Sequence, residues 1–161
     1  MLKKKDNNKN SSYKIIAKNK KANYNYEIIR IFECGIVLLG SEVKSLRERN
    51  ANLSNSYGLL KADEVFLIGL HIKKYTHGTY DYESNRVRKL MLNRKEINII
   101  YKEISRKKLT LVPIEIYFKY GKAKISLALA KGKRKIDKRD LIKKRETDRE
   151  LSRIFKVYKY K

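Results

Sequence analysis

The chain has 161 residues, of which 41 are lysine or arginine and 17 are aspartate or glutamate, so its formal net charge at pH 7 is +24. A charge of this size repels itself in a compact state unless something negative neutralises it, so nucleic acid is the first partner to consider and a membrane surface the second. The length suits one domain with a real core plus appendages, and no apolar run approaches the roughly 20 residues that a membrane-spanning helix needs.

The amino terminus and the cysteine content favour a cytoplasmic protein. Residues 1–14 are polar and lysine-rich, without the apolar stretch of a secretory signal. They show no periodicity, and we expect a disordered amino terminus there. Cys34 is the single cysteine, which excludes an internal disulfide, and it is most simply a small core residue.

Residues 15–130 predict a body built mainly from short strands. Strand-like composition, either apolar and β-branched or alternating, occurs in seven runs: residues 26–32, 35–39, 57–60, 65–72, 86–92, 109–120 and 122–130. The first two runs are expected to meet at a bend around Cys34. The third and fourth form a hairpin across residues 62–64, and the last two form another that turns at Tyr120 and Gly121.

Two helices are predicted within the body. Asn93 and Glu96 have the spacing of a capping box, and apolar residues then recur at helical spacing over residues 94–106. Residues 41–47 suit a shorter helix with Ser41 as its N-cap. Short strands with few helices predict a mainly β fold, a small antiparallel OB-fold-like barrel with two or three helices and a basic C-terminal tail.

The tail, residues 131–161, carries fourteen Lys or Arg and five Asp or Glu. Such a run cannot bury itself, so alone it should stay solvated, and it suits contact with phosphates. Four apolar residues recur at i, i+3, i+4 and i+7: Leu151, Ile154, Phe155 and Tyr158. This spacing predicts an amphipathic helix once the tail is docked. The boundary between body and tail is drawn between Ala130 and Lys131, where the alternation stops.

No catalytic or metal site stands out. Two histidines and one cysteine do not match the usual spacing of a zinc site, and no glycine-rich phosphate loop joins a strand to a helix. Asp81 and Glu83 alternate and would face one way on an extended chain, which leaves a metal pair as an alternative to the preferred solvated loop. We therefore expect a protein with no catalytic residue, no metal and no cofactor.

The polar segment 73–85 holds four aromatic rings beside basic residues. The rings are Tyr75, His77, Tyr80 and Tyr82, and the basic neighbours are Lys73, Lys74, Arg86, Arg88 and Lys89. Unpaired RNA bases stack on such rings. The alternative is that some of these rings cap the end of the barrel, and the sequence leaves both open.

In addition, the chain resembles the SsrA-binding protein (small protein B) family over residues 17–156. The matching residues are Gly40, Glu42, Val43, Lys44, Ser45, Leu46 and Arg47, then Ala51, Asn52, Leu53, Ser54, Ser56 and Tyr57, then Arg88, Lys89, Leu90 and Leu92, then Leu111, Val112 and Pro113, then Tyr117, Phe118, Lys119 and Gly121, and finally Ala130, Lys131, Gly132, Lys133, Asp137, Lys138 and Arg139. The combination is specific because it runs in order along nearly the whole chain.

The resemblance implies a monomeric, cytoplasmic OB-like barrel that binds the tRNA-like domain of transfer-messenger RNA and rescues stalled ribosomes. Its partners would be that RNA, the small-subunit RNA of the decoding centre and, through the charged RNA, elongation factor Tu, with no membrane. The RNA-binding residues that the resemblance implies are Glu33, Met91 and Asn93. To these we add Arg88 and Lys89, the basic residues beside the aromatic segment. The implied ribosome-binding tail residues are Gly132, Lys133, Arg134, Asp137, Lys138, Arg139, Ile154 and Phe155.

A carboxylate is unexpected in an RNA site. Glu33 would accept hydrogen bonds from base amino groups or a 2′-OH, or would orient an arginine, and a purely structural ion pair is equally open. Three positions depart from the family. Tyr24 stands where histidine is common, keeps a ring that can stack and is therefore included among the RNA-binding residues. Asn55 stands in place of aspartate and keeps an acceptor. Ile136 replaces an aromatic residue or histidine, so it cannot stack on a ribosomal base.

The sequence therefore predicts a non-enzymatic RNA-binding adaptor of trans-translation. Composition alone also allows a barrel-type ribosomal protein with a basic extension. A metal-dependent nuclease that uses Asp81 and Glu83 ranks below both.

Overall fold

The structure, a computed structural model, describes residues 13–76, 82–134, 136, 146, 147 and 151. In chain order its elements are β1 (Tyr13–Lys18), α1 (Ala22–Asn25), β2 (Tyr26–Ile36), α2 (Gly40–Arg47), β3 (Ala51–Asn52), β4 (Tyr57–Lys61), β5 (Glu64–Ile68), β6 (His71–Ile72), β7 (Arg88–Met91), α3 (Arg94–Arg106), β8 (Thr110–Lys119) and β9 (Lys122–Gly132). The predicted mainly β fold with two or three helices is confirmed, because strands predominate over three helices in the part of the chain that the structure describes.

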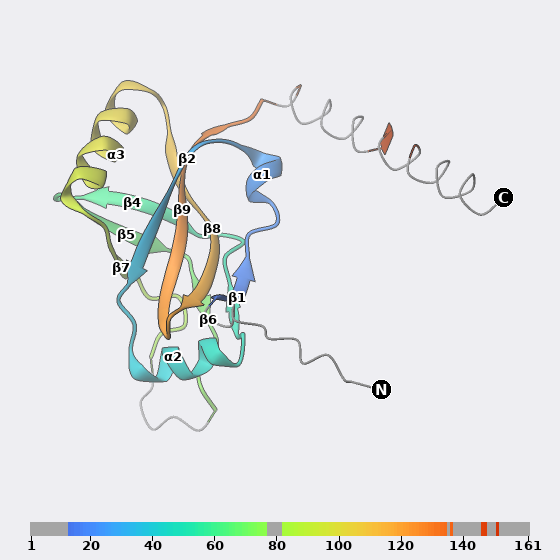
Figure 1. Cartoon of the computed structure of the whole chain (residues 1–161), viewed down its shortest axis with the longest axis vertical. Coiled ribbons are helices and arrows are strands. Elements are labelled where there is room, and N and C mark those ends of the chain that lie inside the picture. The colour runs from blue at the N-terminus through green and yellow to red at the C-terminus, as the bar shows by residue number, and fades with distance from the viewer. Residues whose placement is uncertain (1–12, 77–81, 135, 137–145, 148–150, 152–161) are drawn as a thin grey trace, which may run out of the picture.

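Antiparallel pairing joins most strands into one curved sheet. The strand order is β1-β8-β4-β5-β7-β2-β9, and β8 also pairs with β9, so the pairings lead from β8 around to β9 and back. β3 and β6 form a separate two-stranded sheet. Figure 1 shows α2 and α3 at opposite ends of the sheet in this view, with α1 beside the start of β2.

Alternate residues of the strands build the core inside this sheet. On β9, Ile125, Leu127 and Leu129 are almost fully buried, as the alternating sequence predicts. Each such side chain stabilises the fold by about 1.5–3 kcal/mol through removal of apolar surface from water. Cys34 is also fully buried, and burial raises the pKa of its thiol to about 12. It is therefore a core residue, as predicted, and not a reactive thiol.

The predicted bend around Cys34 is wrong, because β2 runs without a break from Tyr26 to Ile36. Gly35 suggests a bend in the sequence, but in the structure it pairs with Met91 of β7 and with Lys124 of β9. A Cβ on residue 35 would meet the Met91 Cε atom at 2.8 Å. The glycine therefore serves the close approach of a neighbouring side chain.

The two hairpins predicted around residues 62–64 and at Tyr120 and Gly121 are confirmed, because β4 pairs with β5 and β8 pairs with β9. Ala62 and Asp63 between β4 and β5, and Tyr120 and Gly121 between β8 and β9, all have positive φ. Positive φ at both central residues is the geometry of the two-residue turns that match the twist of paired strands.

The predicted strand over residues 65–72 is interrupted at Gly69, whose φ is +75°, and β5 and β6 on either side of it belong to different sheets.

The helix predicted over residues 94–106 is confirmed as α3, and the Asn93 N–H donates a hydrogen bond of 3.0 Å to Glu96 Oε2. The helix predicted over residues 41–47 is confirmed as α2, but its N-cap is Leu39 and not Ser41. Glu42 accepts the Leu39 N–H at 2.8 Å, which fixes the start of α2.

A buried ion pair joins α2 to β7. Arg88 Nη2 lies 2.7 Å from Glu42 Oε1, and both side chains are 0% exposed. Arg88 also donates to the carbonyl oxygens of Leu70 and Ser84, and Arg86 pairs with the same carboxylate. Arg88 was expected among the RNA-binding residues, whereas the structure buries it completely in this ion pair.

β9 continues past Ala130, the predicted end of the body. Gly132 pairs with Tyr26 and Lys131 with Glu27. The Lys133 N–H then donates to Asn25 O at 2.9 Å, and Lys133 Nζ to Asn23 O at 2.9 Å. The first residues of the basic segment are therefore part of the folded body. Among the described residues, no helix is long and apolar enough to cross a membrane.

Candidate nucleic-acid interface

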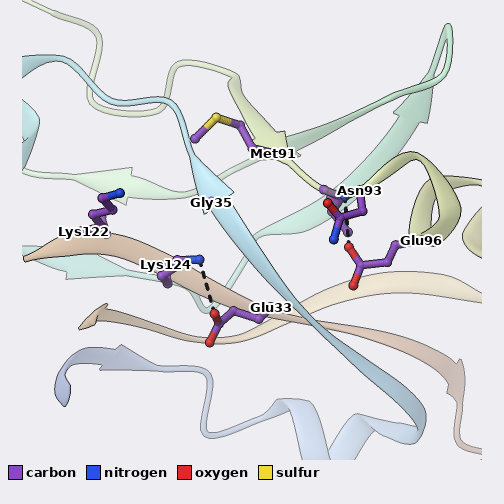
Figure 2. Close-up of a pocket in the computed structure, with 9 residues that line it drawn as sticks. Glu33, Gly35, Met91, Asn93, Glu96, Lys122 and Lys124 are labelled. Atoms are coloured by element: carbon purple, nitrogen blue, oxygen red, sulfur yellow. Dashed lines mark hydrogen bonds and ion pairs between the residues drawn. The ribbon is translucent and has the colours of Figure 1, made fainter. Parts of the chain in front are cut away.

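A surface pocket of about 380 Å³ brings together the three residues on which the RNA prediction depends. Its lining residues come from β2, β7, the start of α3 and β9: Glu33, Gly35, Met91, Leu92, Asn93, Glu96, Lys122, Ala123 and Lys124. Figure 2 shows Met91 over Gly35, Asn93 beside Glu96, and Lys124 bonded to Glu33. Glu33, Met91 and Asn93 thus share one surface although 60 residues separate the first from the last.

Glu33 is held by three donors. Its Oε2 accepts the Lys119 Nζ and Tyr117 hydroxyl hydrogen bonds, each at 2.8 Å, and its Oε1 accepts Lys124 Nζ at 3.3 Å. These bonds, Lys119 first and Tyr117 second, lower the pKa of the Glu33 carboxyl from 4.5 to about 2. The side chain is still 40% exposed. Glu33 therefore presents a charged acceptor whose Oε1 has a lone pair left for a further donor.

This geometry predicts how stability depends on pH. A carboxyl with a lowered folded-state pKa stabilises the fold above its unfolded pKa, and that contribution is lost as the pH falls through the folded value. Glu33→Gln should therefore lower the free energy of unfolding at pH 7 by no more than about 1 kcal/mol, since the pair is exposed. The difference should shrink between pH 4.5 and about 2. Urea unfolding of the unsubstituted chain and of Glu33→Gln across this pH range measures the difference in unfolding free energy. A difference that did not change with pH would contradict the lowered pKa of Glu33.

Met91 and Asn93 complete the lining of this pocket. Met91 is 55% exposed and lies over β2 because Gly35 opposite has no side chain. Asn93 is exposed at the start of α3, where it stands beside Glu96. An apolar thioether, an amide, a carboxylate and the ammonium groups of Lys122 and Lys124 can together contact a base edge, a 2′-OH and a phosphate.

The remaining residues predicted to bind RNA lie elsewhere. Arg88 is fully buried, so its side chain has no exposed surface with which to contact RNA directly. Lys89 is exposed on β7, forms an ion pair with Glu64 and does not line the pocket. Tyr24 is half-buried on α1, which borders the start of β2 and not the pocket.

The predicted tail residues divide into two sets. Gly132, Lys133 and Arg134 are described at the end of β9, and Ile136 is 68% exposed. Asp137, Lys138, Arg139, Ile154 and Phe155 lie outside the described residues, as do the amino-terminal residues 1–12 and the helix predicted around residues 151–158, apart from Leu151.

The aromatic segment is attached to α2. The buried Tyr82 donates its hydroxyl to Lys73 O at 2.7 Å, which favours the capping interpretation for this ring. Tyr75 is half-buried, with the Lys44 ammonium 5.6 Å from its ring centroid. His77, Tyr80 and Asp81 lie outside the described residues. Within the ranges that are described, no group of three His, Cys, Asp or Glu could hold a metal ion.

Sequence reasoning missed the groups that hold Glu33. Lys124 faces outward from β9, and the strand alternation does show this. However, Lys124 meets Glu33 only because β2 and β9 pair with Gly35 opposite Lys124. Tyr117 and Lys119 come from β8, whose pairing with β9 places Tyr117 opposite Lys124. The donors to Glu33 can therefore be identified only from the register of β2, β9 and β8, because no local sequence motif brings them together.

Comparison with known proteins gives a consistent result. The family model of the SmpB protein matches residues 16–157. The SsrA-binding protein of Syntrophobacter fumaroxidans is 51% identical over 144 residues, 89% of each chain, and that of Mycobacterium ulcerans is 45% identical over 150 residues, 92% of this chain and 89% of the other. A solved chain described as "tmRNA-SmpB: a journey to the center of the bacterial ribosome" is 38% identical with a TM-score of 0.62, and the match covers 78% of this chain and 93% of that one. On this similarity, the chain belongs to the SmpB protein family.

Proposed function

We propose that the chain is an RNA-binding adaptor of trans-translation. It binds the tRNA-like domain of transfer-messenger RNA and delivers this RNA to stalled ribosomes in the bacterial cytoplasm, as a monomer and without catalysis of its own. The observation that carries the proposal is the convergence of Glu33, Met91 and Asn93 on one pocket in a chain of this family. Family membership also favours the adaptor over a ribosomal protein or a nuclease.

The pocket's chemistry supports recognition of RNA beyond general attraction. The net charge of +24 attracts any polyanion and makes binding strongly dependent on salt. Glu33 opposes that attraction, so it contributes favourably only where a donor such as a base amino group or a 2′-OH reaches it. The ion pair with Lys119 and Lys124 and a role in RNA binding are therefore compatible, because the ion pair fixes the carboxylate in place.

The basic segment, residues 131–161, is proposed to contact the ribosome. Its residues Gly132, Lys133, Arg134, Asp137, Lys138, Arg139, Ile154 and Phe155 would enter the small-subunit decoding centre and the empty messenger channel. Elongation factor Tu would join through the charged RNA. The fourteen Lys and Arg side chains of this segment suit contact with the phosphates of ribosomal RNA. If the segment folds only when it binds in a channel that holds no messenger, its folding distinguishes a stalled ribosome from a translating one.

Single substitutions in the pocket test the proposal. Met91→Ala removes an exposed side chain, and Glu33→Gln removes the charged acceptor without a change in shape. Each is expected to weaken binding of the tRNA-like domain at moderate salt by about tenfold, or about 1.4 kcal/mol. Asn93→Ser should do the same while it keeps a residue that can cap α3, which alanine would not. Titration of a labelled tRNA-like domain measures the affinity.

The matched control is Glu64→Gln, which removes an exposed, ion-paired carboxylate on β5 outside the pocket. It should leave the affinity unchanged. If the pocket variants lost affinity only in proportion to a lower melting temperature, or if Glu64→Gln weakened binding equally, the pocket would not be the recognition site.

A further inference from the structure

The side chains that donate to the Glu33 carboxylate differ in how firmly they are held. Tyr117, on β8, is only 3% exposed, whereas the side chains of Lys119 and Lys124 are 39% and 29% exposed. A lysine ammonium is carried on a flexible four-carbon stem, while two side-chain torsions place a tyrosine hydroxyl. Tyr117 is therefore the donor whose position the fold determines most closely.

Neighbouring strands hold Tyr117 on both sides. It lies opposite Lys124 of β9 and opposite Ile15 of β1. Its ring packs against the ring of Tyr13, with the centroids 4.5 Å apart and the planes at 37°. The Tyr13 hydroxyl in turn donates to Glu115 Oε1 at 2.7 Å. The backbone of Tyr117 is thus fixed between two strands, and Tyr13 covers its ring.

The hydrogen bond between Tyr117 and Glu33 has one direction. Burial raises the pKa of the Tyr117 hydroxyl to about 12, and the bond to Glu33 is the second cause. The Glu33 carboxyl, whose pKa is about 2, is ionised at neutral pH. An ionised carboxylate only accepts, so the proton stays on the tyrosine and Tyr117 is the donor throughout the neutral range.

RNA phosphates would compete with Glu33 for its two lysines. Lys119 and Lys124 are partly exposed, and Lys124 also lines the Glu33 pocket (Figure 2). A phosphate is a strong acceptor for an ammonium group, so bound RNA draws on the same donors as the carboxylate. The Tyr117 hydroxyl is uncharged and lies on a buried side chain, so a phosphate does not take it in the same way.

From this geometry we propose that Tyr117 is the positioning residue of the RNA site. Its hydroxyl holds Glu33 Oε2, which leaves Oε1 for a donor on the RNA while Lys119 and Lys124 become available to phosphates. The inference rests on the proposed function and gives Tyr117 a part in discriminating between RNAs. Phosphate contacts give affinity for any RNA, whereas contacts to base edges and 2′-OH groups distinguish one RNA from another. Tyr117 is uncharged and acts through Glu33, so it should affect specificity and not general affinity.

Binding of two RNAs by matched variants tests this role. Tyr117→Phe removes the hydroxyl and keeps the ring, so the chain should fold, which thermal melting checks. We expect it to weaken binding of the tRNA-like domain about fivefold and to leave binding of a random RNA of equal length unchanged. Tyr13→Phe is the matched control, because it loses the same atom from the ring packed against Tyr117 without a bond to Glu33, and it should change neither affinity.

Lys124→Gln shows the contrasting behaviour of a phosphate-binding residue. It should weaken binding of both RNAs and lower the slope of affinity against salt concentration by about one, whereas Tyr117→Phe should leave this slope unchanged. Equal losses for both RNAs in Tyr117→Phe, or the same loss in Tyr13→Phe, would overturn the positioning role.

Nuclear magnetic resonance separates positioning from a merely structural role. In Tyr117→Phe the pKa of the Glu33 carboxyl should rise above about 2, because its charged form loses a donor, and Tyr13→Phe should leave it unchanged. In the unsubstituted chain the Tyr117 hydroxyl proton should stay protected from solvent exchange when the tRNA-like domain is bound, a result that depends on no variant. Loss of this protection, or an unchanged Glu33 pKa in Tyr117→Phe, would contradict the proposal.

A double-variant cycle keeps this inference separate from the proposed function. In a chain that already carries Glu33→Ala, Tyr117→Phe should cause no further loss of affinity for the tRNA-like domain. The same loss with and without Glu33 would mean that Tyr117 does not act through Glu33, and the proposal would be wrong. If Glu33→Ala weakens binding and Tyr117→Phe does not, only the role of Tyr117 is refuted. If Glu33→Ala and Met91→Ala both leave binding unchanged, the proposed function of the pocket fails as well.

Discussion

Replacing Glu42 with alanine is expected to lower the free energy of unfolding by about 3–5 kcal/mol, because it leaves the buried Arg88 guanidinium without its counter-charge. Both side chains are 0% exposed, and their atoms lie 2.7 Å apart. Burial alone raises the pKa of the Glu42 carboxyl, but hydrogen bonds from Arg86 and the Leu39 N–H and the charge of Arg88 outweigh it, so the pKa lies below its usual value. The Glu42 carboxylate is therefore charged at neutral pH, where it neutralises the buried Arg88 guanidinium. Urea unfolding at pH 7 measures the loss.

Two controls show that the effect comes from an unpaired buried charge. The double variant Glu42→Leu with Arg88→Met removes both charges and should recover much of the lost stability, since apolar side chains of similar volume often replace buried pairs. Glu64→Ala breaks the exposed pair with Lys89 and should cost less than about 1 kcal/mol. A double variant as unstable as Glu42→Ala would contradict this account.

Removal of residues 135–161 is expected to abolish ribosome rescue while binding of the tRNA-like domain stays within about threefold of that of the full chain. The Glu33 pocket lies entirely within residues 33–124, and the strand pairs of β9 end at Gly132. The truncated chain therefore keeps the pocket proposed to bind RNA and loses the segment proposed to contact the ribosome. Rescue is measured in reconstituted translation on a messenger without a stop codon.

The position of the cut matters for this experiment. Truncation after Ala130, at the boundary that the sequence suggests, would also remove Lys131, Gly132 and Lys133. These residues pair with β2 or bond to α1, so that shorter chain should melt at a lower temperature than the chain cut after Arg134. If the chain cut after Arg134 lost RNA binding and rescue equally, the division between a binding body and a ribosome-contacting segment would be wrong.

Local signals predicted those parts of the fold that depend on neighbouring residues. Asn93 and Glu96 marked the start of α3, and Tyr120 with Gly121 marked the last hairpin, because capping and turn geometry involve residues close in sequence. The continuous β2 was missed because a glycine in a strand suggests a bend, whereas Gly35 makes room for Met91 across the ladder.

The candidate site depends on contacts that no local pattern encodes. Arg88 was predicted to bind RNA. No local pattern shows its burial, because arginine is rarely buried and its partner Glu42 stands 46 residues earlier. Glu33 was singled out only through the family resemblance. Its donors Tyr117 and Lys119 come from β8, 84 and 86 residues away, and become neighbours through the register of β2, β9 and β8.

Competition binding at moderate salt tests the central claim most directly. The full chain is titrated with transfer-messenger RNA in the presence of excess ordinary tRNA. A parallel titration uses a random RNA of equal length as the competitor. Transfer-messenger RNA is expected to bind about a hundredfold more tightly than either competitor, or more, which corresponds to about 2.7 kcal/mol. Equal competition by all three RNAs would contradict it, because binding would then reflect only the attraction between a charge of +24 and any polyanion.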